Sequence, residues 1–150
     1  MVYQIFDLDG TVIDSRHRQA ALPNGDFDLA HWRENSTPEK IAADTLFPLA
    51  ETMRKRYYRG EFVIICTSRI MTEADFQFLD DNKIYSDAIL FRPDDVMDGD
   101  ADLKEFMLDE FFEGLGEIGL DNVRCVMYED NLSVIERLRS RGVLCSVEIN

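Results

Sequence analysis

Short apolar runs alternate with longer amphipathic stretches along the chain. The apolar runs are rich in β-branched and aromatic residues, as buried strands are, and they occupy residues 2–6, 62–66, 88–91, 123–127 and 143–147. Between them apolar residues recur with helical spacing, most clearly over 48–60, 72–82, 100–116 and 131–142. Strands that alternate with helices predict an α/β fold, with five parallel strands in one sheet and helices on both faces.

Several of the predicted helices carry recognisable end signals. Pro38 and Pro48 can each occupy a first helical turn, where a missing N–H group leaves no hydrogen bond unmade. Thr72 and Asp75 have the spacing of a capping box, and Gly142 follows a basic last turn, as is typical of a helix C-terminus. The amphipathic stretches are therefore predicted to be helices with defined ends.

Length and continuity favour a single domain. A chain of 150 residues can bury a real hydrophobic core, and we expect one domain over residues 1–150, without repeats or linkers. The one irregular stretch, 16–37, is polar and mixed, with a short helix expected near 28–32.

Composition narrows the class of protein. The chain is 45% hydrophobic and 31% charged, and it has no window of about 18 apolar residues that could span a membrane. The basic start and apolar stretch of a signal peptide are missing as well, so we expect a cytoplasmic protein. Cys66, Cys125 and Cys145 form no CxxC pair and lie in apolar runs, which predicts small core residues in a reducing compartment.

The net charge bears on possible partners. At −14 the chain repels nucleic acid in general. Recognition of a single strand end stays open, because that needs only a local basic patch.

Polar side chains follow three of the predicted strands. In parallel sheets, ligands bind at the carboxyl ends of the strands, where the strand order reverses. The residues that collect there are Asp7, Asp9 and Thr11 after the first strand, Thr67, Ser68 and Arg69 after the second, and Glu129, Asp130 and Asn131 after the fourth, with Lys104 on the helix before the fourth.

Each of these pieces has a simpler explanation when taken alone. Asp9 with Gly10 is a common turn dipeptide, and residues 67–69 and 129–131 resemble helix caps. Lys104 could be a solvated helix lysine. Their joint occurrence, in order and after neighbouring strands, favours an active site.

At this point a resemblance to a known family becomes clear. The segments "DLDGT", "ICTSR" and "YEDN", together with Lys104, resemble the four motifs of the haloacid dehalogenase (HAD) superfamily of phosphotransferases, and the likeness spans residues 2–147. It implies a three-layer Rossmann-like fold with strand order 3-2-1-4-5.

The resemblance also implies catalytic roles. Asp7 would be the nucleophile that forms an aspartyl-phosphate, and Asp9 the general acid and then the general base. Thr67 would offer its hydroxyl group to the phosphoryl group, and Lys104 would neutralise phosphate and nucleophile. The presence of Asp9 argues against a dehalogenase, which has no alkoxide to protonate.

A magnesium site is implied at the same place. Hard oxygen ligands for Mg²⁺ would come from Asp7, Asp130 and Glu129 and from the backbone carbonyl of Asp9. The fourth motif reads Glu-Asp where Asp-Asp is commoner, so Glu129 could coordinate directly or only through water.

Substrate choice in this superfamily depends on cap insertions. Residues 92–103 are too few for a cap of the second type, and 16–37 leaves room only for a small flap, so we expect a minimal cap or none. An open site favours a large or macromolecular phosphate ester.

Within the superfamily, the chain is most similar to the 3′-phosphatase domain of phage-type polynucleotide kinase/phosphatases. The similarity rests on Arg18, eleven residues after the nucleophile, on the "FDLAHW", "TSR" and "FRPDDVMDGDADLK" segments, and on "RGVLC". No P-loop motif is present, so a kinase half is not expected. The expected substrate contacts are Gly10, Thr11, Arg18, Ser68, Arg69 and Arg92.

The sequence thus predicts a Mg²⁺-dependent phosphomonoesterase that removes a 3′-phosphate from polynucleotide or nucleotide ends, with a phosphomonoester, such as a single-stranded nucleic-acid end, as partner. One alternative is a small-molecule phosphatase such as a 5′(3′)-nucleotidase. Another is a non-catalytic HAD-like binding domain, against which the intact set of Asp7, Asp9, Thr67, Lys104 and Asp130 speaks.

Overall fold

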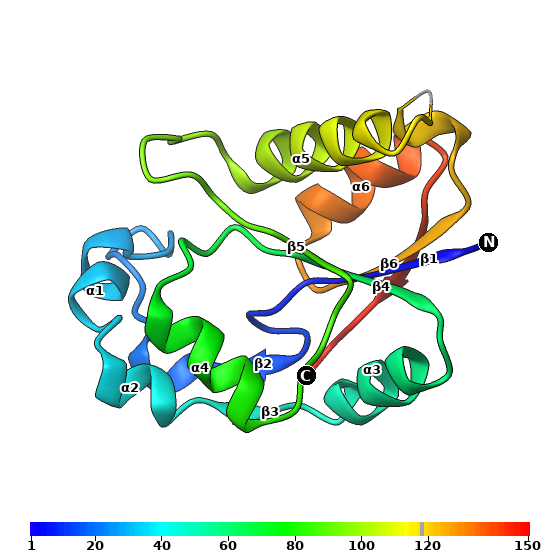
Figure 1. Ribbon diagram of the computed structural model, residues 1–150. Helices are drawn as coiled ribbons and strands as arrows, with labels where there is room; N and C mark the ends of the chain where they lie inside the picture. The colour runs from blue at the N-terminus through cyan, green and yellow to red at the C-terminus, as the bar shows by residue number, and fades with distance from the viewer. Residues whose placement is uncertain (118) are drawn as a thin grey trace.

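A five-stranded parallel sheet runs through the centre of the computed structural model, which describes residues 1–117 and 119–150 (Figure 1). Its spatial order is β5-β4-β1-β6-β7. These strands are β1 (Tyr3–Phe6), β4 (Phe62–Cys66), β5 (Ala88–Leu90), β6 (Cys125–Glu129) and β7 (Leu144–Val147). Numbered in chain order among themselves, they have the predicted order 3-2-1-4-5, which confirms the expected fold.

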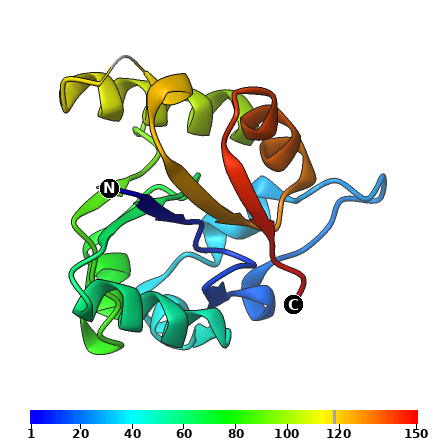
Figure 2. The same cartoon turned by 90° about the vertical axis from the view of Figure 1, so that its right-hand side faces the viewer.

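Helices cover both faces of the sheet, as predicted. The helices of the described residues are α1 (Leu29–Glu34), α2 (Pro38–Ala42), α3 (Leu49–Tyr58), α4 (Glu73–Asp81), α5 (Asp100–Gly114) and α6 (Leu132–Ser140), with 3₁₀ turns η1 (Arg16–Arg18) and η2 (Leu120–Asn122). Viewed from the side, α5 and α6 lie above the sheet, and α3 and α4 lie below it (Figure 2).

Alternate residues of the central strands build two hydrophobic cores, because side chains of a strand point to opposite faces. Phe6 and Ile65 join the core under α3 and α4. Ile5, Ile64 and Met127 join the core under α5 and α6. The central strands are thus largely apolar on both faces, with buried Gln4 accepting a hydrogen bond from Tyr128, and the charged residues lie at their ends.

The predicted helix signals are found at or near the expected positions. Thr72 and Asp75 form the capping box of α4, and Pro38 lies in the first turn of α2. Pro48 is the residue before α3 rather than within its first turn. Gly142 has φ +81°, the left-handed backbone conformation that ends a helix without strain at glycine.

Two details of the sheet differ from the prediction. The fourth parallel strand, β6, covers Cys125–Glu129 instead of residues 123–127, because η2 occupies the chain up to Asn122 and strand pairing with β1 begins at Cys125. Glu129 is therefore the last residue of a strand. The chain also forms a second, two-stranded sheet that periodicity could not show, since each strand has two residues: β2 (Ile13–Asp14) and β3 (Thr45–Leu46).

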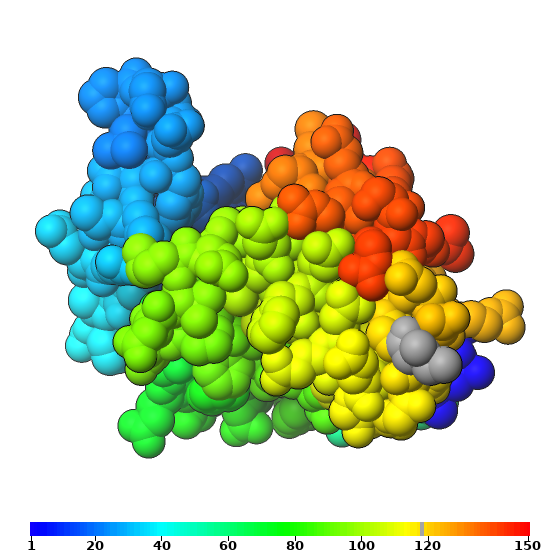
Figure 3. Space-filling model, turned by 90° about the horizontal axis from the view of Figure 1, so that it is seen from above, coloured from blue at the N-terminus to red at the C-terminus, as the bar shows by residue number. Residues whose placement is uncertain are grey.

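The expected flap segment, 16–37, holds η1, an isolated β-bridge between Ala21 and Phe27, and the predicted short helix, α1. The segment around residues 20–30 stands out from the body of the molecule (blue in Figure 3). Asp28 caps α1 by accepting a hydrogen bond from the backbone N–H of His31.

Cys66 and Cys125 are buried, as expected of core residues, whereas Cys145 is only partly buried, and all three are free thiols. Across residues 1–117 and 119–150, no helix has the length and apolar character needed to cross a bilayer.

Candidate active site

The nucleophile predicted from the sequence, Asp7, lies at the point where β1 ends beside β6. Parallel pairing of these strands brings it next to Glu129, and α5 contributes Lys104. Lys104 Nζ lies 2.8 Å from Asp7 Oδ1 and 2.6 Å from Glu129 Oε2, and all three side chains are buried. The structure therefore brings together three residues that are far apart in the sequence.

In the cluster of Asp7, Glu129 and Lys104, two carboxyl groups share one ammonium group. Burial alone would lower the pKa of Lys104, but the carboxylates of Asp7 and Glu129 raise it, so the ammonium group stays charged. Burial and the charge of Asp7 raise the pKa of Glu129 well above its usual range. Burial, a hydrogen bond with Asp7 and the negative charge of Asp7 raise the pKa of Asp130 to about 6.

The donor set fits a divalent cation. Asp7, Glu129 and Asp130 each offer a carboxylate oxygen within 4.8 Å of the others. When ionised, the three carboxylates and one ammonium group carry an excess of two negative charges, and carboxylate oxygens are the ligands that Mg²⁺ prefers. Glu129 already accepts hydrogen bonds from Lys104 and from the backbone N–H groups of Asp130 and Asn131. Asp7 and Asp130 are therefore the better ligands.

Gly10 and Thr11 shape the loop that holds these carboxylates. Gly10 has φ +85°, and a Cβ atom at this position would lie 2.2 Å from Asp130 Oδ2, so only glycine fits here. Thr11 Oγ1 lies 3.0 Å from Asp7 Oδ2 and 3.4 Å from Asp130 Oδ1 and is buried. Thr11, expected as a substrate contact, thus orients the carboxylate of Asp7.

Two hydroxyl residues follow β4. Thr67 is buried, and its Oγ1 accepts a hydrogen bond from the backbone N–H of Arg69 at 3.1 Å, which leaves its own proton to donate. Ser68 Oγ is buried and has no hydrogen-bond partner among the residues that the structure describes. A buried hydroxyl without a partner is a group that a ligand oxygen can satisfy.

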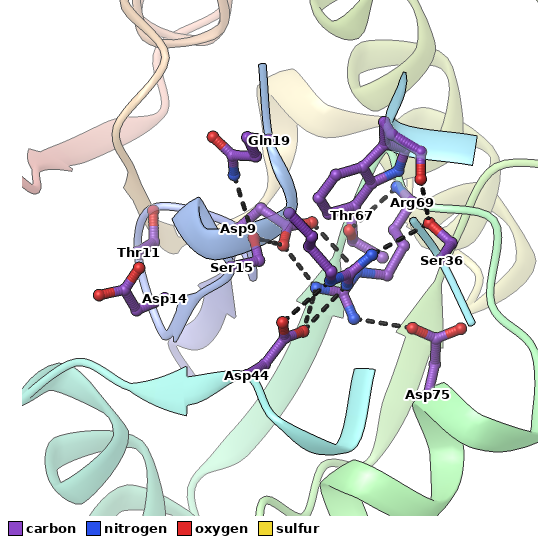
Figure 4. A network of polar contacts seen from close by, with 12 residues as sticks. Asp9, Thr11, Asp14, Ser15, Gln19, Ser36, Asp44, Thr67, Arg69 and Asp75 are labelled. Atoms are coloured by element: carbon purple, nitrogen blue, oxygen red, sulfur yellow. Dashed lines mark hydrogen bonds and ion pairs between the residues drawn. The ribbon is translucent and has the colours of Figure 1, made fainter. Parts of the chain in front are cut away.

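Asp9 belongs to a second cluster, shown in Figure 4. Arg69 donates to it from Nε at 3.1 Å and from Nη2 at 2.5 Å, and Ser15 Oγ donates at 2.6 Å. Burial would raise the pKa of Asp9, but the charge and hydrogen bonds of Arg69 outweigh burial and lower it. Arg69 also donates from Nη1 to Asp75 at 2.7 Å. These contacts favour the ionised form of Asp9.

Arg18 joins the same network but is directed away from solvent. Its side chain is 1% exposed, and its Nε and Nη2 atoms each donate to Asp44 at 2.9 Å. Nη1 donates to Ser36 at 3.0 Å, and the guanidinium group lies 4.0 Å from the centre of the Trp32 ring. Asp44 Oδ2 is also 3.5 Å from Arg69 Nη2. Arg18 therefore ties the flap segment to the body of the protein.

The third expected substrate arginine, Arg92, is bound to backbone carbonyls. It donates to the carbonyl groups of Ser68 at 2.9 Å, Val96 at 3.0 Å and Asp98 at 2.8 Å. These contacts hold the loop after β5 against the chain that follows β4.

Sequence reasoning missed the partners of these arginines. Asp44, Ser15 and Ser36 lie in no motif, Trp32 ends the "FDLAHW" segment without an assigned role, and the pairing of β2 with β3 that places Asp44 is too short to predict. The capping box of Asp75 was recognised, but only as a helix end. A useful signal would have been that buried arginines require carboxylate partners.

The sequence profile of the bacteriophage T5 5′-deoxynucleotidase family matches residues 1–147. The chain belongs to this family. A curated relative, the 5′-deoxynucleotidase of Escherichia phage T5, is 38% identical over 79 residues, which cover 50% of this chain and 32% of the relative. The match to this member of the family thus spans about a third of its length.

Solved structures of HAD-like hydrolases share this fold. A HAD-like hydrolase from Streptococcus pneumoniae has a TM-score of 0.71 at 13% identity over 98% of this chain and 84% of its own. A chain of the Pnkp1/Rnl/Hen1 complex has a TM-score of 0.67 at 22% identity over 97% of this chain and 45% of its own. The magnesium-bound HAD-hydrolase YfnB of Bacillus subtilis has a TM-score of 0.62 at 11% identity over 96% and 86%.

Proposed function

We propose that this chain is a Mg²⁺-dependent phosphomonoesterase that hydrolyses deoxynucleoside 5′-monophosphates through an aspartyl-phosphate at Asp7. The observation that carries the proposal is the buried contact of Asp7 with Lys104, beside Asp130, in a chain matched by the T5 5′-deoxynucleotidase family along almost its whole length. Because the matching family is one of 5′-deoxynucleotidases, we propose a deoxynucleoside 5′-monophosphate as the substrate in place of the polynucleotide 3′-phosphate expected from the sequence.

The reaction follows from the two aspartates. A carboxylate oxygen of Asp7 attacks phosphorus, and the bond between phosphorus and the 5′ oxygen breaks, leaving its electron pair on that oxygen. Asp9 gives the leaving oxygen a proton. Asp9 then takes a proton from water as the water attacks the phosphorus of the acyl phosphate, which releases phosphate and restores Asp7. Mg²⁺ held by Asp7 and Asp130 would supply charge to the phosphoryl oxygens.

Lys104 and Thr11 prepare Asp7 for this step. Lys104 holds Oδ1 at 2.8 Å and Thr11 holds Oδ2 at 3.0 Å, so the carboxylate cannot rotate freely. A fixed nucleophile loses little entropy when it reacts. The buried hydroxyl of Ser68 and the hydroxyl of Thr67 are placed after the neighbouring strand, where phosphoryl oxygens can accept their protons.

Asp9 has to change partners before it can act as an acid. In the structure it is an ionised carboxylate held by Arg69. A substrate phosphate competes with Asp9 for the guanidinium group, and this competition would free the carboxylate to take a proton. In this role Arg69 remains a substrate contact, as the sequence analysis proposed.

A polynucleotide 3′ end is the second candidate, supported by the resemblance of the motifs to 3′-phosphatase domains. We rank it lower because two of the arginines assigned to a strand end are otherwise engaged. Arg18 binds Asp44 and Ser36, and Arg92 binds three backbone carbonyls. Neither presents a spare guanidinium face to a phosphate backbone.

The test is a substrate panel in Mg²⁺ and in EDTA. It contains the four deoxynucleoside 5′-monophosphates, a 3′-phosphorylated oligonucleotide and a 5′-phosphorylated oligonucleotide. We expect the mononucleotides to have the highest kcat/KM and EDTA to stop all turnover. Preference for the 3′-phosphorylated oligonucleotide would favour the second candidate, and full activity in EDTA would refute metal dependence.

A further inference from the structure

A hollow of about 340 Å³ opens beside the acidic residues of the site. Its lining includes Asp9, Gly10 and Asp130, and it continues to Arg16, Gln19 and Phe47. The last three belong to no catalytic motif. They are brought there by the pairing of β2 with β3, the two short strands that the sequence did not reveal.

Phe47 is held in place by its backbone rather than by the core. Its N–H group donates to the carbonyl of Val12 at 2.9 Å, and β3 ends at the residue before it. The ring is partly exposed and belongs to neither hydrophobic core, as far as the described residues go. A fixed, half-open aromatic ring at the mouth of an active site is a surface on which a planar ligand can pack.

Arg16 completes this wall. Its guanidinium group lies 5.4 Å from the centre of the Phe47 ring. Asp14, on β2, holds Arg16 through two hydrogen bonds of 2.9 Å and 2.7 Å. The charge of Arg16 is thus balanced within the protein, and its planar group extends the surface that Phe47 offers.

We propose that this hollow binds the nucleoside of one nucleotide, with the base packed against Phe47 and Arg16. The inference rests on the proposed function and specifies its substrate. A volume of about 340 Å³ is near the lower end of small-molecule sites, which run from about 300 to 1,000 Å³, so it suits one nucleoside better than two.

The charged residues that line the hollow also favour a nucleoside monophosphate. Asp9, Asp130 and Glu148 line the hollow, and the charge of Arg16 is already balanced by Asp14. A nucleoside carries no charge and can enter. A second phosphate, as in a diphosphate or an oligonucleotide, would be repelled by Glu148, whereas Arg69 balances the charge of Asp9 and Mg²⁺ would balance that of Asp130. The hollow therefore selects the monophosphate of a single nucleoside.

The experiment compares thymidine 5′-monophosphate with 2-deoxyribose 5-phosphate, which differ only in the base. Phe47→Ala, and Phe47→Leu as a variant that keeps apolar bulk, should lower kcat/KM for the nucleotide by roughly tenfold and leave that for the sugar phosphate unchanged, because loss of a base-stacking ring costs about this much. Phe106→Ala removes a 62% exposed ring on α5 and should change neither. Equal losses on both substrates, or no loss on either, would overturn the subsite.

A second arm separates this inference from the proposed function. If the wild-type protein hydrolyses neither compound, the proposed 5′-deoxynucleotidase activity fails, and the hollow is judged by NMR with thymidine alone. Thymidine should shift the Phe47 ring resonances and should bind more weakly to Phe47→Leu. If thymidine leaves those resonances unmoved, the hollow is not a nucleoside site.

Glu148 lines the hollow but has no proposed catalytic role, so its replacement tests whether negative charge excludes a second phosphate. Glu148→Gln should raise turnover of a 5′-phosphorylated dinucleotide relative to thymidine 5′-monophosphate. An unchanged ratio would show that Glu148 does not select against a second phosphate.

Discussion

Arg69 holds the carboxylate of Asp9 through two hydrogen bonds, from Nε to Oδ2 at 3.1 Å and from Nη2 to Oδ1 at 2.5 Å. Asp7, the proposed nucleophile, is held instead by Lys104. The two aspartates of the first motif, separated by one residue, are therefore bound by different cations and belong to different networks. Two carboxylates can therefore follow the same strand, because each has its own positively charged partner.

The proposed acid role of Asp9 predicts a dependence on the leaving group. Asp9→Asn should lower kcat/KM for thymidine 5′-monophosphate by about 10²- to 10⁴-fold, the usual contribution of a general acid. It should lower kcat/KM for p-nitrophenyl phosphate much less, because nitrophenolate leaves without a proton. Steady-state kinetics on both esters make the comparison. Equal losses would mean that Asp9 does not protonate the leaving group.

Asp44 should be a main stabiliser of the flap segment. It is buried and accepts two hydrogen bonds from Arg18, so Asp44→Asn leaves a buried guanidinium group without its counter-charge. We expect a loss of about 3–5 kcal/mol in the free energy of unfolding, measured by urea denaturation.

The matched control for Asp44→Asn is Asp14→Asn, which breaks an ion pair with the exposed Arg16 and should cost at most about 1 kcal/mol. If both variants lose the same stability, Asp44 does not have the structural importance that its burial indicates.

The sequence was sufficient for the sheet and for the residues at its carboxyl edge. Asp7 and Asp130 could be placed because each follows a predicted strand, whereas the role of Lys104 and the strand order came from the resemblance to the HAD motifs. The network around Arg18 and Arg69 could not be placed. It depends on the antiparallel pairing of β2 with β3, and two-residue strands leave no periodic pattern in a sequence.

The hollow beside the site could not be predicted from the sequence either, because it too depends on the pairing of β2 with β3. Phe47 lies 40 residues after Asp7, directly before the helix predicted over 48–60, and belongs to none of the predicted motifs. Only the pairing of Ile13 with Leu46 brings it to the mouth of the site.

Mg²⁺ should stabilise the folded protein, and more strongly as pH rises. The folded-state pKa of Asp130, about 6, is above its unfolded value near 4, so without metal the fold binds an extra proton and loses stability from this group as pH rises from about 4 to about 6. Mg²⁺ needs the ionised carboxylate. At a hundredfold excess over Kd, the gain in free energy of unfolding is about 2.7 kcal/mol.

Melting temperatures in EDTA and in Mg²⁺, at pH 5 and pH 8, test this expectation. The difference between Mg²⁺ and EDTA should be larger at pH 8 and should shrink in Asp130→Asn. If the difference in melting temperature is the same at both pH values, or is unchanged in Asp130→Asn, the cation does not bind at Asp130.

Lys104 should be needed for stability as well as for turnover. Lys104→Met removes the ammonium group that two buried carboxylates share, and we expect the free energy of unfolding to fall by about 3–5 kcal/mol in EDTA. Mg²⁺ should restore part of this loss by replacing the positive charge. Lys55→Met, an exposed substitution on α3, should change stability by no more than about 0.5 kcal/mol. Equal stabilities of the two variants would contradict the charge balance described for the site.

The measurement that tests the account most directly is the fate of the phosphoryl group at Asp7. Wild-type protein and Asp7→Asn are mixed with 5′-³²P-labelled thymidine monophosphate in Mg²⁺, quenched in acid, and assayed for released phosphate and for protein-bound label that hydroxylamine discharges. We predict phosphate release with hydroxylamine-sensitive label in the wild type. In Asp7→Asn we predict no label, a native circular dichroism spectrum, and turnover reduced by on the order of 10³-fold or more. Turnover by Asp7→Asn at a rate close to that of the wild type would contradict the account.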